Sequence, residues 1–522
     1  MTGSSALSSP PLGTANAGGG SSTAPLTRRE FQTLFLTTLG SMMVAIDSTI
    51  VILALPTMTR ELHAPLGTVI WTILAYLLVT AALTTQAGRL GDLLGRGLVY
   101  NSGFAVFTVG SALCGFAPTA QFLIGSRVVQ AIGGAVMFAN AAALIATVFP
   151  PQRRGRAFGM MTLGWSLGAI LGILLGGVIT TFLGWRYIFF INIPIGVVAV
   201  GWGLRTLPRT EPQTVRFDIP GFLTLSVALS LICYGAIEIA SYGSSATYLA
   251  YVAIGMALVP VFAALELHSS APMLDIRLLR QRLLGFSLIA GFLQGLGYLS
   301  VIFLLTMYLQ GLRGLSPLNA SLLLIPGYLV GGFFGPWMGR HVDRIGPRII
   351  ATGGLAFLTV AVLAYSTLTI NSWLGLIPVI SLVAGIGTGM FFPANNTAIM
   401  SQAPQGAYGS IAGLRGTLSN MGTLLSFVIT VTIASASVPR YVAYEVFLGT
   451  TNLTGGIGDQ FLSGIRVALY GCAVILTAAA ACSWSRGSHR AAGPSPSGAP
   501  QSIADPAGGS GNVGAGATRP ER

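Results

Sequence analysis

The sequence predicts an all-α polytopic membrane protein, and three observations lead to this fold class. Hydrophobic residues make up 53% of the 522-residue chain and charged residues only 8%, whereas soluble domains carry about 25% charged residues. The mean hydropathy is +0.75. Apolar runs recur along most of the chain, and many reach the roughly 20 residues that a helix needs to cross a bilayer. These features exclude a soluble domain with a single anchor.

Hydropathy and the breaks between apolar runs predict fourteen membrane-spanning helices. Helices are expected because a chain in lipid must satisfy its backbone hydrogen bonds within itself. The predicted spans are residues 31–56, 66–87, 98–117, 120–149, 157–182, 186–206, 218–241, 247–267, 284–310, 316–338, 349–369, 373–398, 410–436 and 461–484.

The arginines concentrate in alternate connecting loops. The net charge is +13 and lysine is absent, so arginine supplies every basic side chain apart from histidine. Most arginines between spans follow the second, fourth, sixth, eighth and tenth spans. The positive-inside rule places these loops in the cytoplasm. We therefore expect the inner (plasma) membrane of a bacterium, with both termini cytoplasmic, and no nucleic-acid partner.

A short glycine–aspartate–glycine pattern occurs twice, at 88–96 after the second span and at 339–348 after the tenth. Parallel repeats of this kind are a transporter design. The tails are rich in Ser, Gly, Ala and Pro, which predicts disorder. The expected organisation is a cytoplasmic tail at 1–27, a six-helix half at 28–210, two inserted helices at 211–270, a second six-helix half at 271–485 and a second cytoplasmic tail at 486–522.

Asp47 is an acidic residue inside the first span. A charge at that depth costs at least about 2.5–3.5 kcal/mol on insertion scales. Such a residue is expected to face a cavity, to have a partner or to carry a proton. Met43 and Gly40 share its helical face, as in a soft cavity wall. The simpler alternative is a structural acid tied to a neighbouring helix.

Arg127 lies inside the fourth span, with Gln130 and Gly134 on the same helical stripe. An arginine keeps its proton in proteins, so it needs an acid, water or backbone carbonyl groups nearby. Asp47 is the expected partner from an adjacent helix. Such a pair either takes and releases a proton as water access alternates or remains a static buried ion pair.

Several motifs together resemble the major facilitator superfamily, and in particular its drug:H+ antiporter-2 group of fourteen-span, multidrug-efflux transporters. The loop at 88–96 resembles the signature loop of the superfamily. The segments that resemble motifs of the drug:H+ antiporter-2 group are 47–56, 127–135, 185–196 and 217–221. The resemblance implies that Asp47 carries protons and that Arg127 relays or tunes them.

The resemblance also implies that the two repeated loops form a conformational latch, although Leu93 and Gly97 stand where the family usually has basic residues. Tight turns with cytoplasmic positive charge are the alternative. The latch residues implied are Gly88, Asp92, Gly95, Arg96, Asp343 and Arg344.

A stripe of glycines runs along the fifth span, at Gly168, Gly172, Gly176 and the adjacent Gly177. A spacing of four residues keeps small residues on one face, where a second helix can approach closely. The region resembles the family's antiporter motif, but Ile173 replaces its proline, so the bend that proline produces is absent. A packing seam between helices is the alternative.

Polar and soft side chains from both halves are expected to line a substrate cavity. Glu238 is a second acidic candidate for proton coupling, and Arg415 is expected to reach either the membrane surface or the latch. The segment 437–460 is an outer loop that could cap the exit. The candidate cavity residues are Met43, Gln130, Gln294, Tyr298 and Asn395.

These features predict a proton-coupled antiporter that exports hydrophobic or amphipathic compounds, as in drug or antibiotic efflux. The sequence has no nucleotide-binding loop, no catalytic cluster and no metal-ligand pattern. We therefore expect no enzymatic activity and no cofactor or metal, with the proton gradient as the energy source. The expected partners of this monomer are a small substrate, protons and the lipid bilayer. The alternatives are a facilitator or proton-coupled transporter of a specific metabolite or lipid, and a membrane sensor or scaffold.

Overall fold

The computed structural model describes residues 25–208, 217–402, 408–436 and 457–487, and every regular element in these ranges is a helix. Residues 1–24 and 488–522 of the predicted tails and residues 437–456 of the outer loop lie outside the described residues. The first half comprises α1 (Arg28–Glu61), α2 (Leu66–Leu94), α3 (Arg96–Gly115), α4 (Ala120–Val148), α5 (Pro151–Phe182), α6 (Tyr187–Phe190) and α7 (Asn192–Thr206).

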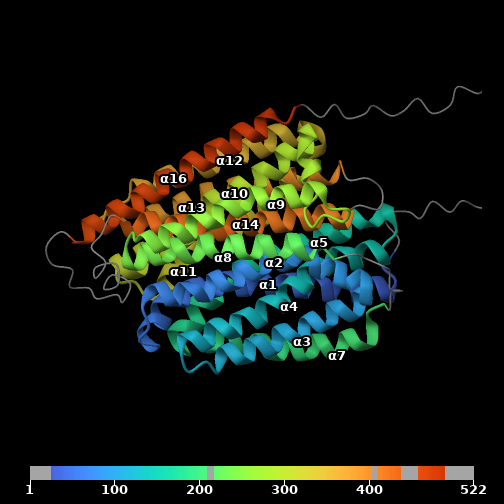
Figure 1. The fold of residues 1–522 in the computed structure, drawn as a ribbon, viewed down its shortest axis with the longest axis horizontal. Helices are drawn as coiled ribbons and strands as arrows, with labels where there is room; N and C mark the ends of the chain where they lie inside the picture. Colours follow the sequence, from blue (N-terminus) through green and yellow to red (C-terminus); the bar gives the residue numbers. More distant parts are fainter. Residues whose placement is uncertain (1–24, 209–216, 403–407, 437–456, 488–522) are drawn as a thin grey trace, which may run out of the picture. The chain divides into compact units, whose positions relative to one another are not determined.

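The remaining helices continue to the end of the described chain (Figure 1). They are α8 (Ile219–Tyr242), α9 (Ala246–His268), the short η1 (Ile276–Arg280), α10 (Arg282–Thr306) with its π-helical extension η2 (Met307–Leu312), α11 (Pro317–Ile345), α12 (Pro347–Ser366), α13 (Leu376–Met400), α14 (Tyr408–Ala436) and α16 (Ile457–Ser485).

Fourteen helical segments of the described chain are long and apolar enough to cross a membrane, which confirms the predicted number. The boundaries differ at several helices: α2 and α11 each end seven residues later than predicted, and α1 begins three residues earlier and continues beyond Pro56 to Glu61. A capping box explains the early start: the Glu30 backbone N–H donates to the Thr27 hydroxyl (3.2 Å), and the Thr27 N–H donates to the Glu30 carboxylate (2.8 Å).

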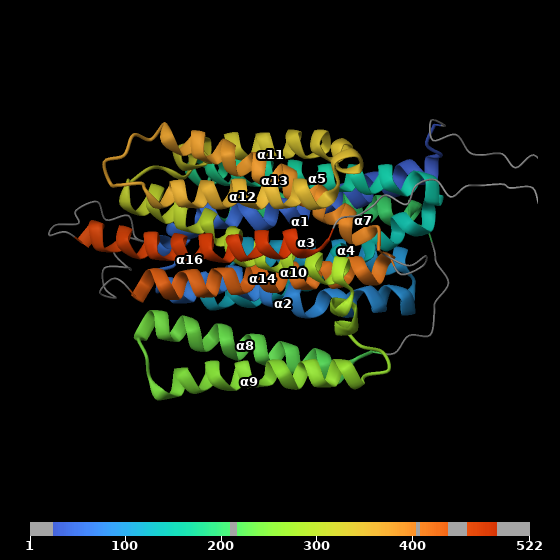
Figure 2. The ribbon, with the colours of Figure 1, turned by 90° about the horizontal axis from the view of Figure 1, so that it is seen from above.

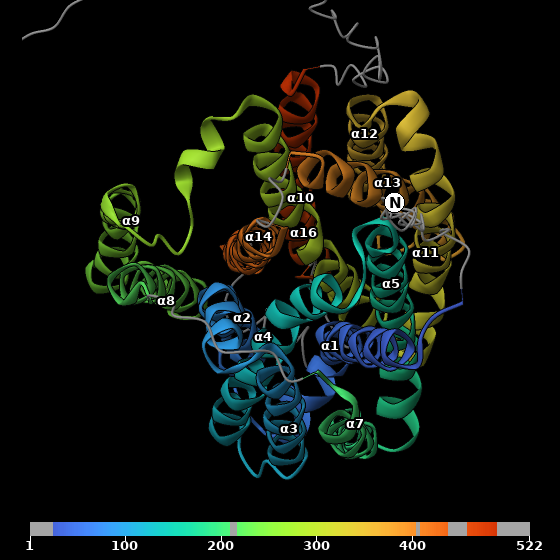
Figure 3. The ribbon, with the colours of Figure 1, turned by 90° about the vertical axis from the view of Figure 1, so that its right-hand side faces the viewer.

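The helices pack in two groups that meet along two seams. Within the first group α1 packs on α5, and α4 packs on α2 and α3. Within the second, α13 packs on α11 and α12, while α10 packs on α14 and α16. Contacts between α5 and α11 and between α2 and α14 join the groups (Figure 3). The pair α8–α9 lies on one side, against α2 and α14 (Figure 2).

Hydrogen bonds join the two groups at both ends of the bundle. At the end with the α2–α3 turn, the hydroxyls of Thr85 and Thr417 lie 2.9 Å apart. At the other end, the Gln310 side chain donates to the Leu53 carbonyl at 3.2 Å. The two groups are therefore in contact toward both ends of the bundle.

The repeated motif corresponds to the same backbone geometry in both groups. Gly95 joins α2 to α3 with φ 97°, and Gly346 joins α11 to α12 with φ 93°. Side chains with a Cβ rarely adopt such positive φ values, so glycine is required at both turns.

The glycine stripe of α5 packs directly against the segment of α1 that carries Asp47. A Cβ added at Gly172 would meet the Thr49 hydroxyl and the Ile46 backbone, and one at Gly168 would meet the Met42 backbone. Gly177 points elsewhere, toward Ser321 of α11. The stripe is thus a close-packed seam that fixes the position of α1 relative to α5.

Replacing Gly172 by valine should destabilise the protein, because the added methyl groups must displace the α1 backbone. Overpacking of this kind costs about 1–3 kcal/mol. Thermal unfolding of the purified protein measures the loss. Gly159→Val is the matched control, since it lies on the same helix and a Cβ there meets nothing within 4 Å. Equal destabilisation by both variants would contradict this interpretation of the seam.

Candidate functional site

The candidate site is a hydrogen-bonded ion pair between α1 and α4. Arg127 Nη1 donates to Asp47 Oδ2 at 2.7 Å, and Gln130 Nε2 donates to Asp47 Oδ1 at 2.8 Å. Arg127 and Gln130 reach the same carboxylate because they are one helical turn apart on α4, where residues three apart are neighbours. Each carboxylate oxygen therefore accepts a bond from a different α4 side chain.

The network extends from this pair to α3 and α7. Gln130 Nε2 also donates to the Ser111 hydroxyl at 2.6 Å, and Asn192 at the start of α7 donates to the same hydroxyl at 3.4 Å. Polar groups from α1, α3, α4 and α7 are thereby linked. The Asp47 carboxylate is thus joined by hydrogen bonds to side chains on three other helices.

Arg127 is enclosed on its remaining sides. Its Nε donates to the Thr72 carbonyl of α2 at 2.9 Å, and its guanidinium carbon lies 4.3 Å from the centre of the Tyr76 ring and 5.7 Å from that of Phe189. Aromatic faces attract a cation. The arginine is therefore held by an acid, a carbonyl group and two rings.

The ion pair is sealed from solvent in this conformation. Asp47 and Gln130 are 0% exposed, and Arg127 is 1% exposed. A buried pair of this kind is strongly coupled, because losing either charge leaves the other uncompensated. The arrangement can hold one exchangeable proton on Asp47 if the fold opens to admit water, and it is a rigid cross-link if the fold does not.

The expected cavity residues fall into separate environments. Met43 is fully buried in the packing between α1, α2 and α3, and Gln130 belongs to the ion-pair network. Tyr298 is partly buried against the main core. Gln294 and Asn395 line one small hollow of about 20 Å³ in the second helix group. Of the five expected cavity residues, the structure thus brings together Gln294 and Asn395.

The first latch loop is tied to α4 through Arg96. Arg96 Nε donates to Asp92 at 2.8 Å, and its Nη1 donates to the Ala143 carbonyl at 3.3 Å and to the Thr147 hydroxyl at 3.0 Å. Gly88 lies nearby on α2, where a Cβ would approach α4 at 3.8 Å. In the second loop Arg344 is exposed, and the side chain of Asp343 lies outside the described residues.

Arg96→Gln should slow transport several-fold with little loss of stability, because it unties the α2–α3 turn from α4. The Asp92–Arg96 pair is nearly 30% exposed, and such pairs contribute no more than about 1 kcal/mol. Transport rate and unfolding temperature, measured on the same preparation, test this. Arg205→Gln, at the same end of the bundle, is the control. A variant with normal rates would show that the tie has no role in transport.

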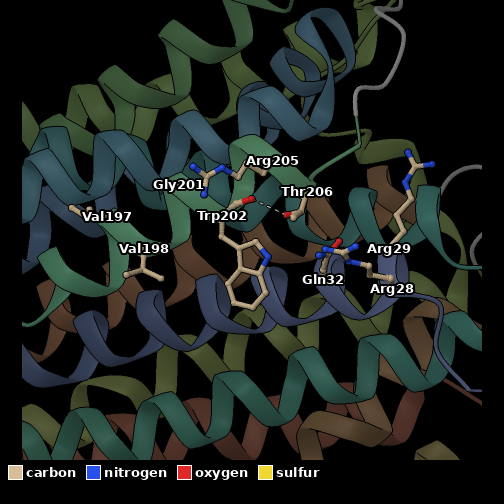
Figure 4. A pocket seen from close by; sticks show the side chains of 9 residues that line it. All are labelled: Arg28, Arg29, Gln32, Val197, Val198, Gly201, Trp202, Arg205 and Thr206. Carbon is tan, nitrogen blue, oxygen red and sulfur yellow. Dashed lines mark hydrogen bonds between the residues drawn. The ribbon is translucent and has the colours of Figure 1, made fainter.

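A larger hollow of about 800 Å³ lies between α1 and α7 (Figure 4). Arg28, Arg29 and Arg205 line one part of it, and Val197 and Val198, both about 60% exposed, line the other. It opens on the outside of the bundle. Arg28 is 19 residues from Asp47 along α1, about 28 Å at 1.5 Å per residue, so this hollow is separate from the ion pair.

In the described residues, fourteen helices are long and apolar enough to cross a membrane, and the first of the two helix groups holds a buried ion pair, an arrangement typical of a membrane transporter. The model of the Major Facilitator Superfamily matches residues 37–427, and the chain belongs to that superfamily. It is therefore a multi-pass membrane transporter and not an enzyme.

Relatives of known or assigned function include exporters and a vitamin transporter. The chain is 30% identical over 400 residues to the riboflavin transporter RibZ of Clostridioides difficile (strain 630), covering 76% of this chain and 87% of the relative. It is 30% identical over 413 residues to the tetracenomycin C resistance and export protein of Streptomyces glaucescens, and the match covers 78% of this chain and 76% of the relative. It is 30% identical over 418 residues to the multidrug efflux pump LfrA of Mycolicibacterium smegmatis, and the match covers 80% of this chain and 83% of the relative.

Solved structures share the fold. A bacterial homologue of the human lysosomal transporter Spinster, in an inward-facing unoccupied conformation, superposes with a TM-score of 0.58 at 17% identity. The match covers 88% of this chain and 98% of the other.

Proposed function

We propose that this protein is a proton-coupled antiporter that exports hydrophobic or amphipathic compounds across the plasma membrane of a bacterium, with both termini cytoplasmic. One observation carries the proposal: a fully buried Asp47 bonded to Arg127 and Gln130 inside the first helix group. A buried acid with exchangeable partners is the group that a proton-driven carrier needs.

In the proposed cycle, Asp47 binds a proton and pairs with Arg127 in turn. When the outer side opens, water reaches the carboxylate and a proton neutralises it. Arg127 then loses its counter-charge but keeps its bonds to the Thr72 carbonyl and to the Gln130 Oε1, the latter at 2.5 Å. When the inner side opens, the proton leaves and the ion pair re-forms. The proton gradient thereby biases the cycle without a cofactor.

The relatives support export over import. Two of them are named for efflux or export of drug-like compounds, each at 30% identity. The latch loop and the arginine-rich loops on its side are consistent with cytoplasmic placement of that end.

Transport of one specific metabolite is the second candidate. The relative named as a riboflavin transporter favours it. Ile173 favours it too. This fully buried residue stands where the antiporter motif has proline, so α5 lacks the bend that the proline produces.

Inverted membrane vesicles separate the two candidates. An acid interior is imposed, a panel of amphipathic compounds is added, and compound uptake and proton efflux are followed together. An exporter accumulates a compound while protons drain, and a proton ionophore abolishes both signals. Uptake that persists without the gradient would instead indicate a facilitator, and transport only in right-side-out vesicles would indicate an importer.

A further inference from the structure

The small hollow in the second helix group brings together side chains from three helices. Gln294 comes from α10, Phe391, Phe392 and Asn395 come from α13, and Arg415 comes from α14. Arg415 is seven residues into α14, about 10 Å from its start at 1.5 Å per residue. Arg415 is the third residue of the candidate membrane span Gly413–Ala434, so the hollow lies toward the end of the bundle where α14 begins.

The Arg415 Nε is buried and donates to no acceptor among the described residues. The Nε atoms of Arg348 and Arg466 are unpaired as well, but Arg348 lies over the Trp484 ring at 4.1 Å and Arg466 Nη2 donates to the Leu368 carbonyl at 2.8 Å. Arg127 has the Asp47 carboxylate. Arg486, on the far side of Asn395, donates to the Asn395 Oδ1 at 3.2 Å and to the Ser483 carbonyl at 2.8 Å. Of these five arginines, Arg415 is the one with neither a hydrogen-bond acceptor nor a ring contact among the described residues.

Gln294 presents a second unmet donor at the same hollow. The side chain is 2% exposed, and its Nε2 has no hydrogen-bond partner in the described structure. An amide nitrogen donates only, and a guanidinium has no acceptor atom. Two unmet N–H groups at one hollow can both donate to an acceptor that enters it, and such pairing is favourable because leaving buried donors unpaired is costly.

The described acids of the second half lie elsewhere. Asp275 caps η1 in the connection before α10, and Asp459 is exposed near the start of α16. Neither forms a salt bridge with Arg415 in the described structure. The side chain of Asp343 is not among the described ones. In contrast to Arg127 of the first half, Arg415 thus has no counter-charge among the described side chains.

We propose that Arg415 and Gln294 form the subsite for an anionic group of the transported compound, such as a carboxylate, with Phe391 and Phe392 contacting its apolar part. A planar guanidinium matches a carboxylate with two parallel hydrogen bonds. The hollow is small and closed in this conformation, so it must enlarge to admit such a group. This inference rests on the proposed function and names its substrate class: amphipathic organic anions.

The charge of the substrate has an energetic consequence. Exchanging one incoming proton for one outgoing monovalent anion moves two elementary charges in the same direction. A membrane potential negative on the cytoplasmic side therefore assists export. Equal exchange of a proton for a monovalent cation moves no net charge and gains nothing from the potential.

Equilibrium dialysis of the purified full-length protein in zwitterionic nanodiscs tests the subsite without a proton gradient. The probes are 2-naphthoate and deoxycholate, each paired with its neutral primary amide. The carboxylates should bind at least about tenfold more tightly than the amides, the effect of one charge-assisted hydrogen bond. Arg415→Gln should abolish this preference and Arg415→Lys should retain part of it. Arg466→Gln, at the other end of the same helix group, should leave it unchanged.

Several results would overturn the proposal. They are equal binding of acid and amide, no binding of either carboxylate to the wild type, or a preference that survives in Arg415→Gln. Competition by chloride as strong as that by carboxylate would assign the hollow to an inorganic anion instead. Thermal unfolding of each variant confirms that it is folded, and Gln294→Leu gives a second, independent loss of preference. Because binding needs no gradient, failure of proton coupling in vesicles would refute the proposed function and not the subsite.

Discussion

Asp47→Asn is expected to abolish proton-coupled transport. Asparagine has nearly the same shape as aspartate, so it can still occupy the space between Gln130 and Arg127. It cannot bind and release a proton, so the step that couples the gradient to the cycle is lost. We expect compound accumulation in acid-loaded inverted vesicles to fall to the level of vesicles that lack the protein.

The matched control is Asp459→Asn, which removes an exposed carboxylate near the start of α16. It should transport normally, because it lies outside the network. If Asp47→Asn retained gradient-driven accumulation, Asp47 would be a structural residue. The next candidate would be Glu238 of α8.

Arg127→Met is expected to destabilise the protein by about 3–5 kcal/mol, the typical cost of leaving one member of a buried ion pair uncompensated. The 0% exposure of Asp47 prevents water from replacing the lost partner. The bond from Arg127 to the Thr72 carbonyl is lost as well. Unfolding of the purified protein in mild detergent, followed by the fluorescence of its tryptophans, measures the difference.

The double variant Asp47→Leu/Arg127→Met should recover most of this stability, since apolar residues of similar volume often replace a buried ion pair without loss. It should not recover transport. This double-mutant cycle separates the two roles of the pair. Additive losses would show that the two side chains are not coupled, and recovered transport would exclude the proton-carrier role of Asp47.

The fold could be predicted from the sequence because hydropathy reports directly on burial in lipid. The errors lie where local chemistry competes with hydropathy. Pro56 was expected to end the first helix, but α1 continues through it, since membrane helices tolerate proline when neighbours satisfy the backbone. The predicted span at 186–206 is one membrane crossing interrupted at Ile191, between α6 and α7. Hydropathy carries no signal for such a break.

The contact between Asp47 and Arg127 was predictable because each charge needs a partner and few are available in the membrane. The role of Gln130 was less evident. It was expected to line a cavity, yet its position three residues after Arg127 points it at the same carboxylate. Ser111 and the Thr72 carbonyl had no sequence signal, since they depend on how α2 and α3 pack on α4.

The glycine stripe and Arg415 show the same limit. A spacing of four residues defines a face of α5 but does not identify α1 as the helix that packs on it. Likewise, Arg415 and Gln294 each stand out as polar residues in apolar spans, but they meet only because α10 packs beside α14. Sequence patterns define faces, and tertiary packing determines which faces meet.

Proton release by the purified protein tests the central claim most directly. A transported compound is added to wild-type protein in weakly buffered solution, and the pH change is recorded alongside that for Asp47→Asn. If Asp47 carries the proton that is exchanged for substrate, the wild type should release up to about one proton per substrate bound and Asp47→Asn should release none. Equal release by both proteins would contradict the account and would place the exchanged proton on another group.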